Sequence, residues 1–88
     1  MKIVIKDHAR FEAHRREISE ELINSVVNNP QQKLPSKKGR VIIQNKYFDQ
    51  DEKREMLLRV IGLETSEIFD VITVYKTSKI SKYWVEGG

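Results

Sequence analysis

The sequence contains no cysteine and only two histidines among its 88 residues. The absence of cysteine excludes disulfide frameworks, thiolate metal sites and cysteine nucleophiles. Two histidines alone argue against a structural zinc site, which needs four ligands drawn mainly from cysteine and histidine. The sequence also lacks a glycine-rich phosphate loop, a zinc-protease helix and a nucleophile elbow. Nothing in it therefore supports an ATPase, a metalloprotease or an esterase, and no metal is expected.

Long apolar runs are absent as well. No run approaches the roughly 20 residues that span a bilayer, and residues 1–6 lack the long apolar stretch of a signal peptide. We therefore expect a cytoplasmic protein that makes no membrane contact. The length suits one domain, residues 1–88, and the hydrophobic content of 39% is enough for one modest core.

The net charge is +3, but the charged residues are unevenly distributed. The net charge is +5 for residues 1–48, which contain ten Lys or Arg and five Asp or Glu. It is −4 for residues 49–70 (three basic, seven acidic) and +2 for residues 71–88 (three basic, one acidic). Segments 28–48 and 71–85 contain basic residues and no acidic ones. Such segregation favours a polyanionic partner, and it is equally compatible with an ordinary mixed-charge surface.

Hydrophobic periodicity predicts an α+β fold, with two N-terminal helices packed on one antiparallel β-sheet. A short strand is expected over residues 2–6, followed by helices over residues 7–16, with Asp7 as N-cap, and 20–28, with Ser19 as N-cap. Residues 31–39 are expected to form a polar loop. Strands are expected over residues 40–47, 56–61 and 68–75.

The same patterns predict which side chains are buried. Ala9, Phe11 and Ala13 should form a narrow apolar side of the first helix. Trp84 is assigned to the core because tryptophan is usually largely buried. The predicted core comprises Leu22, Val26, Val41, Ile43, Leu58, Val60, Val71 and Trp84.

Arg59 interrupts the apolar run of residues 56–61. A charge is costly to bury in such a strand unless it is paired or faces a solvated cleft. An arginine on the open face of a sheet can hold a phosphate by two parallel hydrogen bonds. The alternative is a structural cross-strand ion pair, for example with Asp70.

His8 lies at the predicted start of the first helix, where the helix dipole favours a neutral imidazole that can act as a general base. The alternative is a capping or surface histidine. His14 falls on a different face of that helix and is expected at the surface. Residues 75–84 interleave lysines, hydroxyls and aromatic rings, which can neutralise phosphates and stack on bases. Alternatively, Tyr83 and Trp84 close the core while the lysines remain in water.

Short motifs recur in a particular order between residues 7 and 84. They are Asp7-His8-Ala9 with Arg16 eight residues after the histidine, the segment 18–21, Asn29-Pro30, Lys38-Gly39-Arg40, the segment 57–60 and the block 71–84. In this order they resemble the small prokaryotic family called domain of unknown function 4258 and, more distantly, RelE-like and BrnT-like toxins. Glu12 and Glu17 depart from the arginine and glycine that are frequent in the family, and Glu12 weakens any mechanism that needs two helix arginines.

The resemblance implies a RelE-like or barnase-like fold and RNA cleavage that requires no metal or other cofactor. Such cleavage uses the 2′-hydroxyl as nucleophile and needs a proton acceptor, a stabiliser of the phosphorane and a proton donor. His8 is then the candidate acid or base, and Arg16 and Arg59 are candidates for phosphate stabilisation. Tyr75, Lys76 and Thr77 would orient the substrate or assist proton transfer.

We therefore expect an RNA-directed, toxin-like domain with endoribonuclease activity, paired with a small antitoxin protein. One alternative is a noncatalytic module that binds nucleic acid or protein through the same basic face, and another is a domain whose polar residues are purely structural. The residues expected to contact RNA are Lys37, Lys38, Arg40, Lys76, Thr77 and Lys79.

Overall fold

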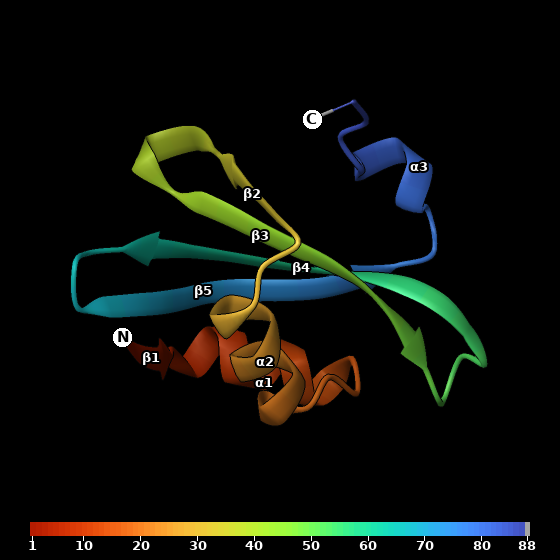
Figure 1. Cartoon of the computed structure of the whole chain (residues 1–88). Helices are drawn as coiled ribbons and strands as arrows, with labels where there is room; N and C mark the ends of the chain where they lie inside the picture. The colour runs from red at the N-terminus through yellow and green to blue at the C-terminus, as the bar shows by residue number, and fades with distance from the viewer. Residues whose placement is uncertain (88) are drawn as a thin grey trace.

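The computed structural model describes residues 1–87, which are organised around a five-stranded sheet with strand order β1-β5-β4-β3-β2 (Figure 1). Each of β2, β3, β4 and β5 is antiparallel to its neighbours within that group. Short turns join β3 to β4 and β4 to β5. The strands are β1 (Lys2–Ile5), β2 (Gln32–Pro35), β3 (Val41–Asp49), β4 (Arg54–Glu64) and β5 (Ile68–Thr77).

The α+β class is confirmed, but the prediction of a purely antiparallel sheet is wrong for one pair of strands. β1 runs parallel to β5, with Lys2 opposite Ile68 and Ile5 opposite Val71. These two strands are distant in the sequence, so no tight hairpin dictates their relative direction. The parallel pairing ends at Ile5, and the chain then continues directly into the first helix.

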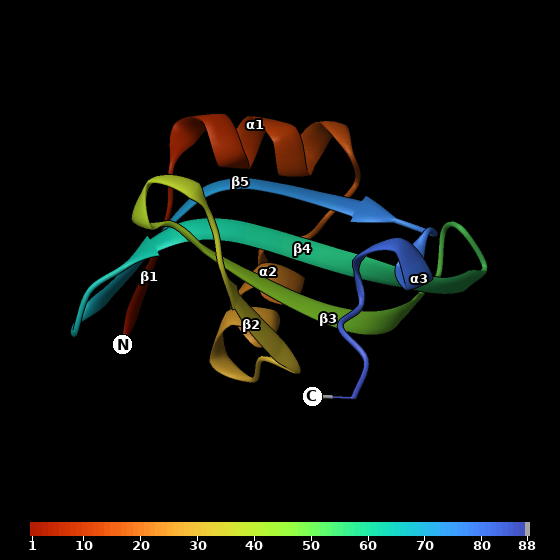
Figure 2. The same ribbon diagram turned by 90° about the horizontal axis from the view of Figure 1, so that it is seen from above.

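Helices α1 (Asp7–Arg15) and α2 (Glu20–Asn28) contribute to the main core, whereas α3 (Ile80–Tyr83) lies across the other face of the sheet (Figures 1 and 2). Figure 2 shows α1 running alongside β5. Ser19 caps α2 as predicted, because its Oγ accepts a hydrogen bond of 3.0 Å from the backbone N–H of Leu22. Lys6, not Asp7, occupies the N-cap position of α1.

The core between helices and strands contains most of the predicted residues. Leu22 and Val41 are only partly buried at its margin. Trp84 was wrongly assigned to it, since it lies partly buried on the far side of the sheet, and Phe11 projects into solvent with 63% of its surface exposed. The buried residues of this core are Ile5, Ala9, Ala13, Ile18, Ile23, Val26, Val27, Ile43, Leu58, Val60, Phe69, Val71 and Val74.

Two stretches contain structure that the sequence patterns do not predict. The expected loop 31–39 includes β2 and a short 3₁₀ turn, Lys37–Gly39, because the polar strand β2 is held by its pairing with β3. The short helix α3 follows β5 in a stretch that carries little helical periodicity. No helix within residues 1–87 has the length and apolar content needed to cross a membrane.

Candidate phosphate-binding cluster

Four polar side chains form a continuous row across the face of the sheet opposite α1 and α2. Gln32, Gln44, Arg59 and Tyr75 occupy directly opposed positions on β2, β3, β4 and β5. Side chains alternate between the two faces of a strand, and the neighbours of Arg59, Leu58 and Val60, belong to the main core. The alternation therefore directs this row to the opposite face.

Hydrogen bonds link every member of the row. The Nε of Arg59 donates to Oε1 of Gln44 at 2.9 Å, and its Nη1 donates to the hydroxyl oxygen of Tyr75 at 2.5 Å. The Nε2 of Gln44 donates to Oε1 of Gln32 at 2.7 Å and to the carbonyl oxygen of Tyr83 at 3.0 Å. The guanidinium is thus held in a fixed orientation by partners from neighbouring strands.

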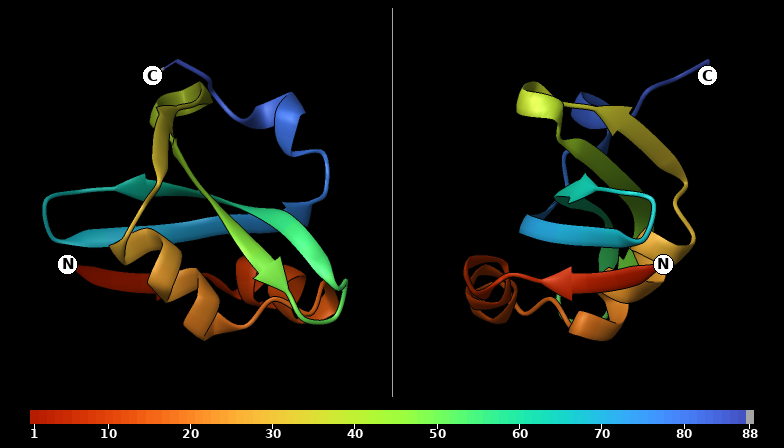
Figure 3. Two further views of the ribbon diagram at one scale, coloured as in Figure 1. Left: turned by 45° about the vertical axis from the view of Figure 1, so that its right-hand side comes forward. Right: turned by 90° about the vertical axis from the view of Figure 1, so that its left-hand side faces the viewer.

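The C-terminal segment covers this row (Figure 3). The Cζ of Arg59 lies 4.2 Å from the ring centroid of Tyr83, within cation–π distance, and Tyr75 and Tyr83 meet edge to face with centroids 6.3 Å apart. Gln32 donates to the carbonyl oxygen of Val85 at 2.6 Å and accepts from its N–H. These contacts hold the segment after α3 over the sheet.

The guanidinium of Arg59 is buried without an acidic partner. The residue is only 9% exposed, and no carboxylate of residues 1–87 lies within ion-pair distance of it. The alternative of a structural ion pair between Arg59 and Asp70 is wrong, since Asp70 pairs with Lys6 instead, with Oδ1 and Nζ 3.8 Å apart. The Nη2 of Arg59 has no hydrogen bond, yet no buried side-chain nitrogen or oxygen in the described chain lacks a partner, so this nitrogen reaches solvent.

Further cations and rings surround Arg59. The Nζ of Lys46 lies 4.1 Å from the centroid of the Trp84 ring system, and that of Lys82 lies 5.3 Å from the ring centroid of Tyr83. The Tyr83 ring that Lys82 approaches also packs on Arg59, and Trp84 follows Tyr83, so these cations and rings lie on the same face of the sheet as the guanidinium. The resulting Arg59 cluster consists of Gln44, Lys46, Arg59, Tyr75, Lys82, Tyr83 and Trp84.

The polar side chains of α1 approach the neighbouring strand. Arg16 pairs with the carboxylate of Glu12, and its Nη1 lies 3.5 Å from the carbonyl oxygen of Val74, the residue before Tyr75. The hydrogen bond from Arg15 lowers the pKa of Glu12, although burial acts to raise it. The positive charges of Arg15, Arg16 and His8 lower this pKa further.

Of the four predicted catalytic residues, the structure brings two into direct contact. Arg59 and Tyr75 are hydrogen-bonded, whereas Arg16 reaches β5 from the helix side of the sheet, at the carbonyl oxygen of Val74. His8 is exposed on α1 and makes no hydrogen bond with any of these three side chains.

Lys76, which was expected to contact RNA, is engaged inside the protein. It follows Tyr75 on β5 and therefore faces the helices, where its Nζ lies 2.9 Å from Oδ2 of Asp49. The two side chains are only 10% and 6% exposed. The hydroxyl of Tyr47 donates to the same carboxylate oxygen at 2.9 Å. Lys76 consequently contributes no free charge to the Arg59 cluster.

The pKa values of this buried group reflect its contacts. Burial raises the pKa of Asp49, but hydrogen bonds from the Glu52 backbone, Lys76 and Tyr47 outweigh it and lower the pKa to about 2. The pKa of Tyr47 is raised, first by burial and then by its hydrogen bond to the Asp49 carboxylate. Asp49 is therefore a carboxylate at neutral pH.

The other predicted RNA contacts form two separate groups. Lys37 and Lys38 lie in the 3₁₀ turn next to Arg40, at the end of the sheet where Val41 faces Gly62. Thr77 lies opposite Leu57 of β4. Leu57 and Gly62 are five residues apart along this strand, which corresponds to about 16 Å at 3.3 Å per residue. Thr77 accepts a hydrogen bond from the backbone N–H of Lys79 close to α3. Only this second group adjoins the Arg59 cluster.

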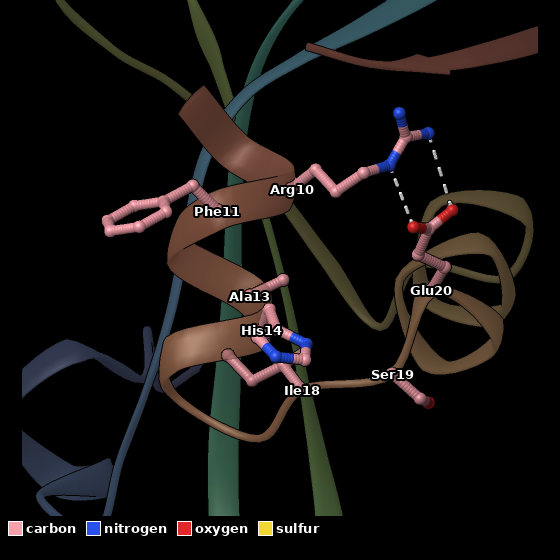
Figure 4. A pocket seen from close by; sticks show the side chains of 7 residues that line it. All are labelled: Arg10, Phe11, Ala13, His14, Ile18, Ser19 and Glu20. Atoms are coloured by element: carbon pink, nitrogen blue, oxygen red, sulfur yellow. Dashed lines mark hydrogen bonds and ion pairs between the residues drawn. The ribbon is translucent and has the colours of Figure 1, made fainter. Parts of the chain in front are cut away.

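A shallow pocket between α1 and α2 contains His14 rather than His8 (Figure 4). Arg10 points across it to Glu20, with Nε and Oε2 separated by 2.8 Å, and this hydrogen bond raises the pKa of Arg10. The ion pair neutralises both charges, and His14 is exposed as predicted. Within residues 1–87, no group of three or more His, Cys, Asp or Glu side chains is arranged to hold a metal ion.

The sequence patterns missed several members of the site. Gln44 ends the apolar run Val41–Ile43 and begins a polar run, so unlike Arg59 it does not conflict with its neighbours and no signal in the sequence marks it as a partner of Arg59. Nothing in the sequence indicates that Tyr83 folds back over Arg59. Its position depends on the path of the chain after β5.

Comparison with known families agrees with the order of the sequence motifs. The family model described as domain of unknown function (DUF4258) matches residues 5–76. The chain belongs to this family. The matched range includes His8, Arg16, Arg59 and Tyr75, whereas α3 with Tyr83 lies beyond it. Among curated proteins and among solved structures, none matches the chain significantly.

Proposed function

We propose that this DUF4258 protein is an RNA-directed, toxin-like domain and that the Arg59 cluster binds a phosphate of single-stranded RNA. The observation that carries the proposal is the buried guanidinium with no carboxylate partner and with one nitrogen open to solvent. A buried cation without a partner is costly, and a phosphate that paired with Nη2 would offset this cost. The fixed orientation imposed by Gln44 and Tyr75 prepares the guanidinium for such a contact.

The surrounding side chains favour a single strand over a duplex. Tyr83 and Trp84 are partly exposed rings on which unpaired bases can stack. Lys46 and Lys82 lie within cation–π distance of these rings. The lysines can therefore contact the phosphates of an RNA strand while the rings contact its bases. The bases of a duplex are already stacked on each other and would not reach the rings.

The proposed activity is metal-independent cleavage of the bound RNA. Attack of the 2′-hydroxyl on the adjacent phosphorus forms a phosphorane, and loss of the 5′-oxygen leaves a 2′,3′-cyclic phosphate end. Arg59 would stabilise the charge on the phosphorane, and the Tyr75 hydroxyl, 2.5 Å from Nη1 of Arg59, would donate a proton to the departing oxygen. His8 on α1 and Arg16 directly after it are the candidates for the proton acceptor and for a second positive charge; both belong to the helix side of the sheet, so an RNA strand bound at Arg59 would have to pass around β5 to reach them.

Binding can be tested by fluorescence anisotropy with a labelled single-stranded RNA at several salt concentrations. Arg59→Met should weaken binding about tenfold to a hundredfold, since hydrogen bonds to charged groups contribute about 1.5–3 kcal/mol. Lys46→Gln and Lys82→Gln should each lower the salt slope by about one. Lys2→Gln removes the same charge from an exposed side chain on β1 and serves as the matched control. Equal losses in the control and the cluster variants would contradict the proposed site.

Cleavage is tested separately by assaying for 2′,3′-cyclic phosphate ends after incubation at neutral pH with a chelator present. Tyr75→Phe keeps the ring and removes the hydroxyl, so it should lower cleavage on the order of a hundredfold while RNA affinity changes little. His8→Ala tests the helix residue in the same assay. Binding without cyclic-phosphate ends would replace the nuclease with a noncatalytic RNA-binding module, and absence of both would overturn the RNA assignment.

A further inference from the structure

The second half of β3 has a neighbouring strand on one side only. β2 pairs with Val41 to Gln44, whereas Asn45 to Asp49 pair with β4 alone. Figure 3 shows β3 extending well past β2. On the side away from β4, the backbone of residues 45–49 therefore has no strand partner. This edge is distinct from the outer edges of the sheet at β1 and β2.

The side chain of Gln31 takes the place of a missing strand at this edge. The backbone N–H of Lys46 donates to Oε1 of Gln31 at 2.9 Å, and Nε2 of Gln31 lies 3.4 Å from the carbonyl oxygen of Lys46. An amide side chain thus makes the pair of contacts that a peptide group of an adjacent strand makes. Phe48 lies two residues after Lys46, so its backbone N–H and C=O also point away from β4. No side chain of residues 1–87 forms a hydrogen bond with them.

The edge opens onto a groove that combines apolar and acidic side chains. Phe48 is 59% exposed, and Leu22 is partly buried nearby. Glu17 and Asp51 are exposed along the same groove. The residues that line it are Glu17, Ser19, Leu22, Tyr47, Phe48, Asp49, Gln50 and Asp51.

The outer edge of β2 offers no comparable site. In β2, the backbone groups of Gln32 and Leu34 point toward β3. Because this direction alternates along a strand, the backbone groups of Lys33 and Pro35 point outward. Proline has no N–H, and lysine and proline at edge positions are common devices against strand addition. Phe48 carries neither protection, so this edge of β3 is open where the edge of β2 is protected.

We propose that the edge of β3 at residues 46–49 binds an extended peptide of a partner protein by strand addition, with alternating basic and apolar side chains in the partner. The peptide would replace the Gln31 side chain at Lys46 and bond to the backbone of Phe48. Its apolar side chains would cover Phe48, and its basic ones would face Glu17 and Asp51. A second copy of this chain is a poor occupant, because it would bring the same acidic groups together. This site uses the backbone of Lys46, whose side chain belongs to the Arg59 cluster, but it does not depend on the proposed function.

The test uses a fluorescein-labelled eight-residue peptide that alternates valine and lysine, titrated against the full chain by anisotropy. A peptide that alternates valine and glutamate controls for charge. The valine–lysine peptide with every second backbone amide N-methylated controls for the ladder of hydrogen bonds. We expect the first peptide to bind and both controls to lose at least tenfold in affinity.

Variants of the chain separate strand addition from simple charge attraction. Phe48→Pro removes the outward N–H without breaking a bond to β4, and it should abolish binding, with circular dichroism verifying the fold. Gln31→Ala removes the competing amide and should strengthen binding about threefold or more. A merely structural Gln31 would give no gain, which would overturn its assigned role.

Three results would overturn the proposal. Failure of the valine–lysine peptide to bind at millimolar concentration would exclude this occupant. Equal binding of the N-methylated peptide would show attraction by charge alone. Self-association in sedimentation experiments that Phe48→Pro abolishes would assign the edge to a second copy of the chain.

Discussion

Replacing Lys76 by methionine tests the internal role of this lysine. The change keeps most of the side-chain volume and leaves the Asp49 carboxylate, only 6% exposed, without its cation. Removing one partner of a buried ion pair typically costs about 3–5 kcal/mol. Asp49 retains hydrogen bonds from Tyr47 and from the backbone N–H groups of Asp51 and Glu52, which moderate the loss. We expect the free energy of unfolding at pH 7 to fall by about 2–3 kcal/mol.

The effect is large for a domain of this size. Total stability should be about 4–13 kcal/mol at about 0.05–0.15 kcal/mol per residue. The loss should lower the melting temperature by about 10–20 °C. Urea unfolding monitored by circular dichroism measures it directly. Asp49→Asn combined with Lys76→Met removes both charges and should recover part of the stability.

The pH dependence provides an independent check. The pKa of Asp49 is about 2 in the folded state, below its ordinary value, so its contribution to stability is present above about pH 4 and is lost as the pH falls toward 2. Allowing for solvent screening, this contribution is about 1–2 kcal/mol. The difference in stability between the unmodified protein and Lys76→Met should narrow over that range.

RNA binding by Lys76→Met decides between the internal and the surface role. At a temperature where the variant is folded, its RNA affinity should match that of the unmodified protein. An affinity loss as large as that of Lys82→Gln, together with a melting temperature lowered by less than about 2 °C, would refute the buried pair.

Three further changes test the fold. Ser19→Ala removes the cap of α2 and should cost about 1 kcal/mol in urea unfolding. Leu58→Ala, in the fully buried core, should cost about 2–5 kcal/mol in the same measurement. Gly62→Ala places a Cβ against the backbone carbonyl oxygen of Asp70 and the Phe69 ring, closer than van der Waals contact, so it should lower the melting temperature by about 4 °C or more. An unchanged melting temperature would contradict the close packing.

The parts of the fold predicted from the sequence are those whose signals are local. Ser19 followed by acidic residues marks the start of α2, and alternating apolar residues mark β3 and β5. β2 lacks such a signal, because Gln32 and Lys33 are polar and the strand depends on its pairing with β3. The parallel pairing of β1 is equally nonlocal, since a strand of four residues contains no indication of its neighbour.

The site was predictable where a residue conflicts with its surroundings. Arg59 stands out because a charge in an apolar strand requires a specific partner or solvent. Its partners could not be identified in the same way, since Gln44 and Tyr75 are fifteen and sixteen residues away and meet Arg59 only through the strand register. Phe11 and Trp84 were misplaced because hydrophobicity alone does not say which face of an element is covered.

The block that follows Val74 shows why a motif that is continuous in sequence need not form one surface. Tyr75, Lys76 and Thr77 belong to a strand, so consecutive side chains project to opposite faces. Tyr75 meets Arg59 on one face, and Lys76 meets Asp49 on the other. A nucleic acid on the Arg59 face can therefore contact only alternate residues of β5, and lysine regains access only at Lys79, after the strand has ended. In the proposed RNA site, the positive charge beside Arg59 then comes from Lys46 and Lys82, which other elements bring to the same face.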